Sequence, residues 1–141
     1  MGAVVAVLIL FVVFGPSQMR SRSHANEAFA EGAMRTISTA EIAFQAAGAK
    51  DEDGDGVGDY GTLEELYAVD PWPAFTGKSK DYVFEVDVIL GDADTTPTFK
   101  ATARPQEYGR KGRKSYYVGE TGVIRFESED RPATSSSVPL N

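Results

Sequence analysis

The sequence predicts an α+β fold, in which one long N-terminal helix packs on a small antiparallel sheet of three or four strands. An apolar block without charges opens the chain, apolar residues then recur at helical spacing, and the second half alternates apolar and polar residues as strands do. The chain has 141 residues, of which 42% are hydrophobic, and this suits a single core. We expect residues 1–24 to form a projecting helix, 25–127 a globular domain and 128–141 a mobile tail.

The opening block MGAVVAVLILFVVFG carries no charged side chain, and none occurs before Arg20. Exposing its ten large apolar side chains would cost on the order of 15 kcal/mol, so they must be buried. Fifteen helical residues reach only about 22 Å, too short for a comfortable membrane span. A secretory signal peptide is disfavoured because the block lacks a basic start. A partial membrane anchor or a helix packed against copies of itself remains. The candidate assembly residues are Val4, Val5, Val7, Leu8, Ile9, Leu10, Phe11, Val12, Val13, Phe14 and Pro16.

Behind the block, the helix is expected to continue to about Ala47 and to stop at Gly48. Gly15 and Pro16 predict a kink or a fresh helix start, because proline lacks a backbone donor and crowds the preceding turn. An apolar stripe at three- and four-residue spacing predicts the buried face. Its members are Phe29, Ala33, Ile37, Ala40, Phe44 and Ala47, and we place Arg22, Glu31, Arg35 and Glu41 on the opposite, polar face.

The second half of the sequence predicts β-strands. Residues 80–90 (KDYVFEVDVIL) and 97–105 (PTFKATARP) alternate apolar and polar side chains, and SYYVGETGVIRFE predicts a hairpin with a glycine-containing turn. The basic cluster RKGRK at 110–114 is interpreted as a solvated hairpin loop. The segment 128–141 offers little to bury.

Residues 51–61 (DEDGDGVGDYG), which we call the acidic loop, follow the long helix. Asp51, Asp53, Asp55 and Gly56 match the opening of an EF-hand-type calcium loop, in which alternate carboxylates converge on a hard cation. The candidate ligands are Asp51, Asp53, Asp55, the carbonyl of Val57 and Asp59. The twelfth position is Thr62 instead of the bidentate glutamate, which predicts weak calcium binding.

A second interpretation of the acidic loop needs no ion. TLEE at 62–65 is a capping box at the start of a helix LEELYAV, and the acidic side chains would then stay hydrated near its positive end. Capping and calcium binding are compatible, because only Thr62 belongs to both patterns.

Composition narrows the function. The net charge of −7 argues against a nucleic-acid binder, because phosphate contacts need a basic face. The chain has no cysteine, so disulfides and thiolate metal sites are excluded. Its one histidine is His24. The acids cluster in one loop and form no evident acid–base pair, so we do not expect an enzyme.

The chain resembles the type IV pilins and the pseudopilins of type II secretion. The similarity rests on the apolar block, Pro16, the polar step RSRSHANEA, the run GAMRTISTAEIAFQ and the hairpin SYYVGETGVIRF. It implies a pilin-like fold and a subunit of an extracellular filament at the bacterial surface. It also implies a homo-oligomer that waits in the cytoplasmic membrane and is assembled by inner-membrane machinery.

The resemblance has one departure. Pilin precursors carry a basic leader, a glycine cleavage site and an acidic residue near the start of the mature helix, and this sequence has none of these. We expect that the given chain begins about six residues inside the mature helix; the alternative is assembly without the acidic pairing. A pseudopilin, or a membrane-tethered module with a calcium-dependent binding surface, stays open as another function.

Overall fold

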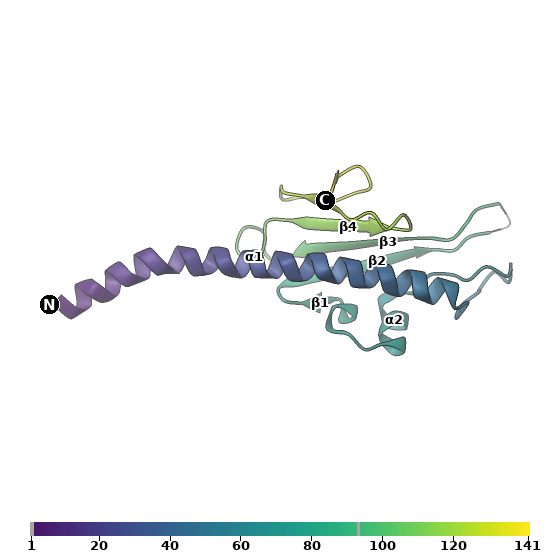
Figure 1. The fold of residues 1–141 in the computed structure, drawn as a ribbon, viewed down its shortest axis with the longest axis horizontal. Coiled ribbons are helices and arrows are strands. Elements are labelled where there is room, and N and C mark those ends of the chain that lie inside the picture. Colours follow the sequence, from purple (N-terminus) through teal and green to yellow (C-terminus); the bar gives the residue numbers. More distant parts are fainter. Residues whose placement is uncertain (1, 93) are drawn as a thin grey trace.

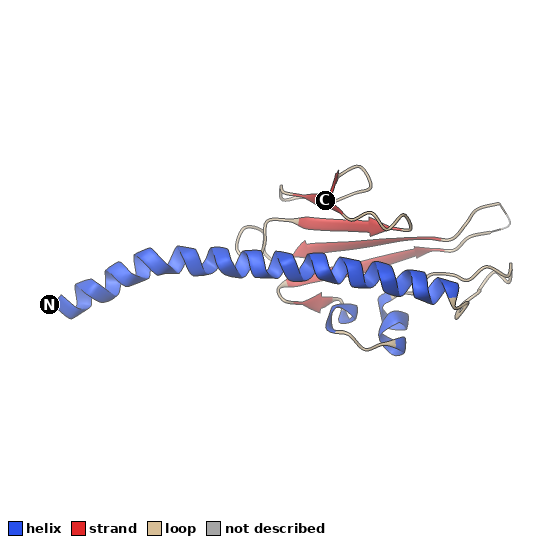
Figure 2. Cartoon of the chain, in the orientation of Figure 1, coloured by secondary structure: helices blue, strands red, loops and turns tan. Residues whose placement is uncertain are grey.

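A computed structural model describes residues 2–92 and 94–141, and side chains from residue 20 onward. It has one long helix that packs on an antiparallel sheet and runs roughly along its strands (Figures 1 and 2). The helices are α1 (Gly2–Ala46), α2 (Leu63–Val69) and the 3₁₀ turn η1 (Pro73–Thr76). The strands are β1 (Lys78–Ser79), β2 (Tyr82–Ile89), β3 (Thr98–Pro105), β4 (Ser115–Gly119), β5 (Arg125–Glu127) and β6 (Val138–Pro139).

Helix α1 continues through Gly15 and Pro16, so the fresh helix start expected there is wrong. The alternative, a kink at Pro16, stays a prediction. The helix ends where the sequence predicts, because Gly48 has a φ of +62° and its amide bonds to the Gln45 carbonyl at 3.1 Å. The rear half of α1 lies over the sheet, and the front half projects beyond it (Figure 1). Within the described residues, no helix combines the length and the apolar character that a membrane crossing requires.

The sheet confirms the α+β class, but the predicted number of strands is wrong. Six strands pair antiparallel in the order β1-β2-β3-β4-β5-β6. The additional strands are β1 and β6, which have two residues each and lie at the two edges. Two-residue strands carry no alternation that a sequence pattern can reveal. The predicted hairpin is present, with Tyr116 opposite Phe126 and Gly122 at a φ of +74° in the turn.

The C-terminal segment 128–141 buries more than the sequence suggests. β6 pairs with β5, and the Leu140 amide bonds to the Ile124 carbonyl at 2.8 Å. Ala133 and Ser137 are buried, and the Arg125 guanidinium donates to the Ser137 carbonyl at 2.9 Å. The expectation that this segment has little to bury is therefore wrong.

The core lies between α1 and the inner face of the sheet. α1 packs on β3 and β4, and the fully buried alanines Ala101 and Ala103 of β3 face it. Small side chains at these positions let the helix lie close to the strands. The largest fully buried apolar side chains are Met34 and Ile37 from α1 and Tyr82, Phe84, Phe99, Tyr116 and Val118 from the sheet.

Candidate metal site in the acidic loop

The acidic loop leaves the end of α1 and returns to the start of α2, and Lys50 closes its base. The Lys50 ammonium bonds Glu65 at 3.0 Å and Glu52 at 3.2 Å, while its carbonyl accepts from the Asp59 amide at 2.7 Å. Both ends of the loop are therefore fixed to the same residue. These contacts of Lys50 fix the two ends of the acidic loop close to each other, with the remaining carboxylates between them.

Three of the predicted ligands converge. One carboxylate oxygen from each of Asp51, Asp53 and Asp59 lies within 4.8 Å of the others. Backbone amides orient the loop, since Gly56 donates to Asp51 at 3.0 Å and Asp55 donates to Asp51 at 3.2 Å. Gly56 has a φ of +84°, which matches the sharp turn expected of the sixth position in a calcium loop.

Asp59 has the feature that best fits a cation. Its side chain is fully buried, and its Oδ2 accepts from the Glu52 amide at 2.8 Å. Its Oδ1 has no hydrogen-bond partner among the described residues. A buried carboxylate oxygen without a partner is costly, and a hard cation would satisfy it. The described residues of the loop therefore fit a metal ion.

The pKa values of the exposed carboxyl groups of Asp51 and Asp53 shift in opposite directions. Hydrogen bonds, first of all from the Gly56 amide, lower the pKa of Asp51. Partial desolvation and the neighbouring carboxylates raise the pKa of Asp53. The carboxylates that oppose the ionised form of Asp53 by charge repulsion are Asp55 and Asp59. A divalent cation in the carboxylate cluster would reduce this repulsion.

The structure does not bring the Asp55 carboxylate into this cluster, and the Val57 carbonyl stays a predicted ligand. The Asp55 carboxylate accepts from the Val57 amide at 2.8 Å, and both residues line a separate hollow. Thr62 caps α2 as predicted: its hydroxyl accepts from the Glu65 amide, and Glu65 accepts from the Thr62 amide. The capping box and the carboxylate cluster are therefore both present.

Glu41 lies in the core, so the prediction that it belongs to the polar face of the helix is wrong. It is fully buried, and its Oε2 accepts from the Gly61 amide at 3.0 Å. Its Oε1 has no partner among the described residues, and desolvation raises its pKa to about 8. One feature of the sequence does indicate this burial. Glu41 follows Ile37 by four residues and precedes Phe44 by three, so it continues the apolar stripe. Glu41 ties α1 to the far end of the acidic loop.

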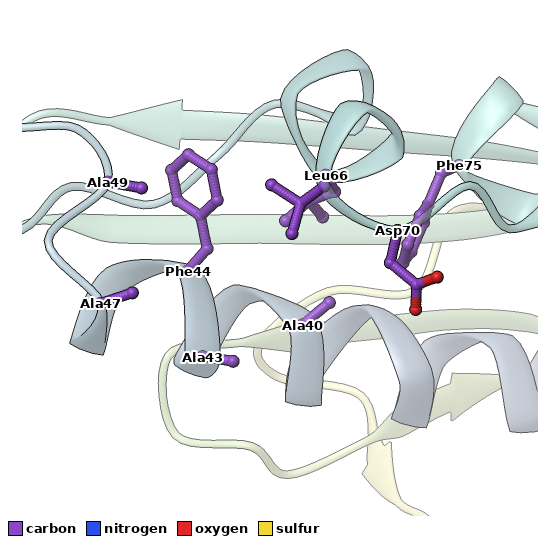
Figure 3. Close-up of a pocket in the computed structure, with 9 residues that line it drawn as sticks. Ala40, Ala43, Phe44, Ala47, Ala49, Leu66, Asp70 and Phe75 are labelled. Atoms are coloured by element: carbon purple, nitrogen blue, oxygen red, sulfur yellow. The ribbon is translucent and has the colours of Figure 1, made fainter.

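An apolar hollow of about 310 Å³ lies between the end of α1 and α2 (Figure 3). On the α1 side its walls are the small side chains of Ala40, Ala43 and Ala47. Phe44 and Leu66 also line it, and Asp70 is its charged member. The alanines leave room between the two helices that larger residues would fill.

No family model, curated protein or solved structure matches the chain. The pilin resemblance therefore stays a prediction from the sequence.

Proposed function

We propose that this chain is a structural subunit of an extracellular type IV pilus-like filament and polymerises through its N-terminal helix. The observation that supports this most is the shape of α1. Its rear half packs on the sheet, whereas its front half extends past every strand (Figure 1). The residues of that front half are apolar in sequence up to Phe14. A projecting helix of this composition needs an apolar environment, and copies of itself supply one.

The proposed assembly residues run from Val4 to Phe14, with Pro16 behind them. Their side chains lie outside the described part of the structure, so the proposal rests on their sequence and on the helix backbone. Before assembly, the same surface would be held in the cytoplasmic membrane, where lipid takes the place of neighbouring helices. The globular part would then face outward around a core of bundled helices.

The test is assembly of the purified full chain after removal of detergent, followed by sedimentation and electron microscopy. We expect filaments from the natural sequence and none from Leu10→Asp, because a charge in a bundle of apolar helices is left unpaired. The control is Val69→Asp on α2, where the valine is 71% exposed and the substitution should be tolerated. A natural chain that stays monomeric without detergent would overturn the proposal; capture of a calcium-dependent ligand by that monomer would favour a tethered binding module.

The second part of the proposal is that calcium stabilises the acidic loop through Asp51, Asp53 and Asp59. The support is the buried Oδ1 of Asp59, which a bound ion would satisfy. Without the glutamate of a full EF-hand, we expect a dissociation constant on the order of 0.1 to 1 mM. Such an ion would cross-link the two ends of a loop in a chain without cysteine.

Calcium titration against the thermal midpoint tests this part. At 10 mM calcium, that affinity corresponds to about 1.4 to 2.7 kcal/mol of stabilisation. Asp53→Asn should remove the response, while Asp87→Asn, an exposed acid on β2, should keep it. An unchanged midpoint of the natural chain at 10 mM calcium would refute the calcium site and leave the filament proposal standing.

A further inference from the structure

The two ends of the globular part carry opposite charge. At the end where α1 stops, the acidic loop and the β2–β3 turn together hold seven carboxylates and no basic residue, and Lys50 directly precedes the acidic loop. We call this the acidic end; its acids are Asp51, Glu52, Asp53, Asp55, Asp59, Asp92 and Asp94. The loop between β3 and β4 lies at the opposite end of the sheet, beside the middle of α1 (Figure 1). It contains Arg110, Lys111, Arg113 and Lys114, and we call it the basic loop.

The acidic end has a hollow of about 460 Å³ that both of its segments line. Asp55 comes from the acidic loop, and Asp92 and Asp94 come from the β2–β3 turn. The Asp92 carboxylate accepts from the amides of Asp94 and Thr95, and these hydrogen bonds lower its pKa. None of these three carboxylates is needed for the proposed calcium ion, so the hollow stays negative when that ion is bound.

The basic loop has a fixed backbone. Asn26 of α1 donates to the Lys111 carbonyl at 2.9 Å, and Glu27 accepts from the Arg113 amide at 2.8 Å. Tyr82 donates from its hydroxyl to the Lys114 carbonyl at 2.6 Å. These three bonds hold the loop against α1 and β2, so its backbone loses little entropy when a partner binds.

Two arginines of the basic loop point into solvent. Arg113 is exposed and forms no ion pair with any described residue. The Arg110 side chain is 65% exposed and lies 3.8 Å from Glu107. Guanidinium groups bind carboxylates through paired hydrogen bonds, so these arginines are suited to an acidic partner.

The two charged ends cannot meet within one molecule. The basic loop is anchored at Asn26 and Glu27, and the acidic end follows Ala46, about twenty helical residues or 30 Å further along α1. This separation far exceeds the Debye length of about 8 Å at physiological salt. In a filament of parallel helices, a shift along the axis brings the acidic end of one copy to the basic loop of another.

We infer that the acidic end receives the basic loop of a second copy of this chain, with Arg113 entering the hollow lined by Asp55, Asp92 and Asp94. This inference rests on the proposed filament and names the contact between successive globular parts. The apolar helices would supply most of the affinity, and the charged contact would fix the register and the polarity of the assembly.

Cross-linking of the full chain tests the contact directly, because the sequence contains no cysteine. We expect Thr96→Cys, which lines the hollow, combined with Arg110→Cys in the basic loop to give a ladder of covalent oligomers when assembled samples are treated with a short bis-maleimide, because both substitutions leave Asp94 and Arg113 in place. The control combines Thr96→Cys with Glu85→Cys, an exposed position in the middle of β2, and should give no ladder. Filaments without a ladder from the first pair would overturn this contact but not the filament. The absence of both filaments and a ladder would overturn the proposed filament and, with it, the contact that rests on it.

A charge exchange gives a second readout. Arg113→Glu and Asp94→Arg should each raise the critical concentration for assembly about tenfold, which corresponds to about 1.4 kcal/mol, because each places like charges together. The double exchange should return the value to within about threefold of the natural chain, a difference below 1 kcal/mol. A double exchange that is as defective as its two single variants combined would overturn the contact.

Discussion

Replacing Glu41 by glutamine should stabilise the protein at neutral pH and remove part of its pH dependence. Glu41 is fully buried, with one carboxylate oxygen bonded to the Gly61 amide and the other without a described partner. Desolvation, the largest cause, raises its pKa from 4.5 to about 8 with a smaller contribution from the nearby Glu65, while the hydrogen bond from the Gly61 amide opposes this shift. Glutamine keeps the acceptor for Gly61 and has no charge to bury.

The sign of the effect follows from the protonation of the two states. Below pH 4.5 both the folded and the unfolded chain hold the proton, so Glu41 contributes no pH dependence. Between 4.5 and about 8 the unfolded chain releases the proton and the folded chain keeps it. The free energy of unfolding then falls by about 1.4 kcal/mol per pH unit, which amounts to roughly 3 kcal/mol at pH 7. Above the folded-state pKa this loss is complete.

Thermal unfolding at several pH values between about 4.5 and 9 measures this loss. Relative to the natural chain, Glu41→Gln should gain stability steadily over this range, by roughly 10 °C in midpoint at neutral pH. Glu64→Gln on α2, where the carboxylate is exposed, is the control and should follow the natural chain. A Glu41→Gln curve parallel to that of the natural chain would show that the buried carboxyl does not hold its proton, and the reasoning would fail.

Three further predictions concern stability, each measured as a thermal midpoint. Gly58→Ala should destabilise the protein strongly, because the added methyl group would clash with the Gln45 carbonyl oxygen. In its matched control, Gly32→Ala, the methyl group meets nothing within 4 Å and should stabilise α1 by about 1 kcal/mol. Equal thermal midpoints of these two variants would contradict this prediction. Thr62→Ala removes the side-chain cap of α2 and should lower the free energy of unfolding by about 1 kcal/mol. A loss of less than a few tenths of a kcal/mol would contradict a stabilising role of the capping box. Deleting residues 133–141 removes β6 and should lower the midpoint, and an unchanged midpoint would mean that this segment adds no stability.

The main helix could be predicted from the sequence because its signals are local. Periodicity correctly placed Ala33, Ile37 and Phe44 in the core, although it also included Ala47, which is exposed. Gly48 marked the end of the helix. The same periodicity contained Glu41, yet residue type placed that carboxylate on the polar face. A pattern of spacing and a rule about polarity disagreed at this position, and the packing against Gly61 decided in favour of spacing.

The candidate metal site divides in the same way. The sequence identified Asp51 and Asp53 from their alternation, since a tight loop brings alternate side chains together. Whether Asp55 or Asp59 completes the cluster depends on how the loop folds back. The bond from the Asp59 amide to Lys50 brings Asp59 inward, while Asp55 turns to the Val57 amide. Spacing alone contains no information about that return.

By itself, the sequence determined the α+β class, the long helix, the β4–β5 hairpin and the position of the acidic loop, because periodicity and turn chemistry act between residues close in the chain. Only the tertiary structure decided the six-stranded sheet, the burial of Glu41 and the placing of opposite charges at the two ends of the globular part. These features come from contacts between distant segments. They depend on which surfaces the long helix covers and which it leaves to solvent.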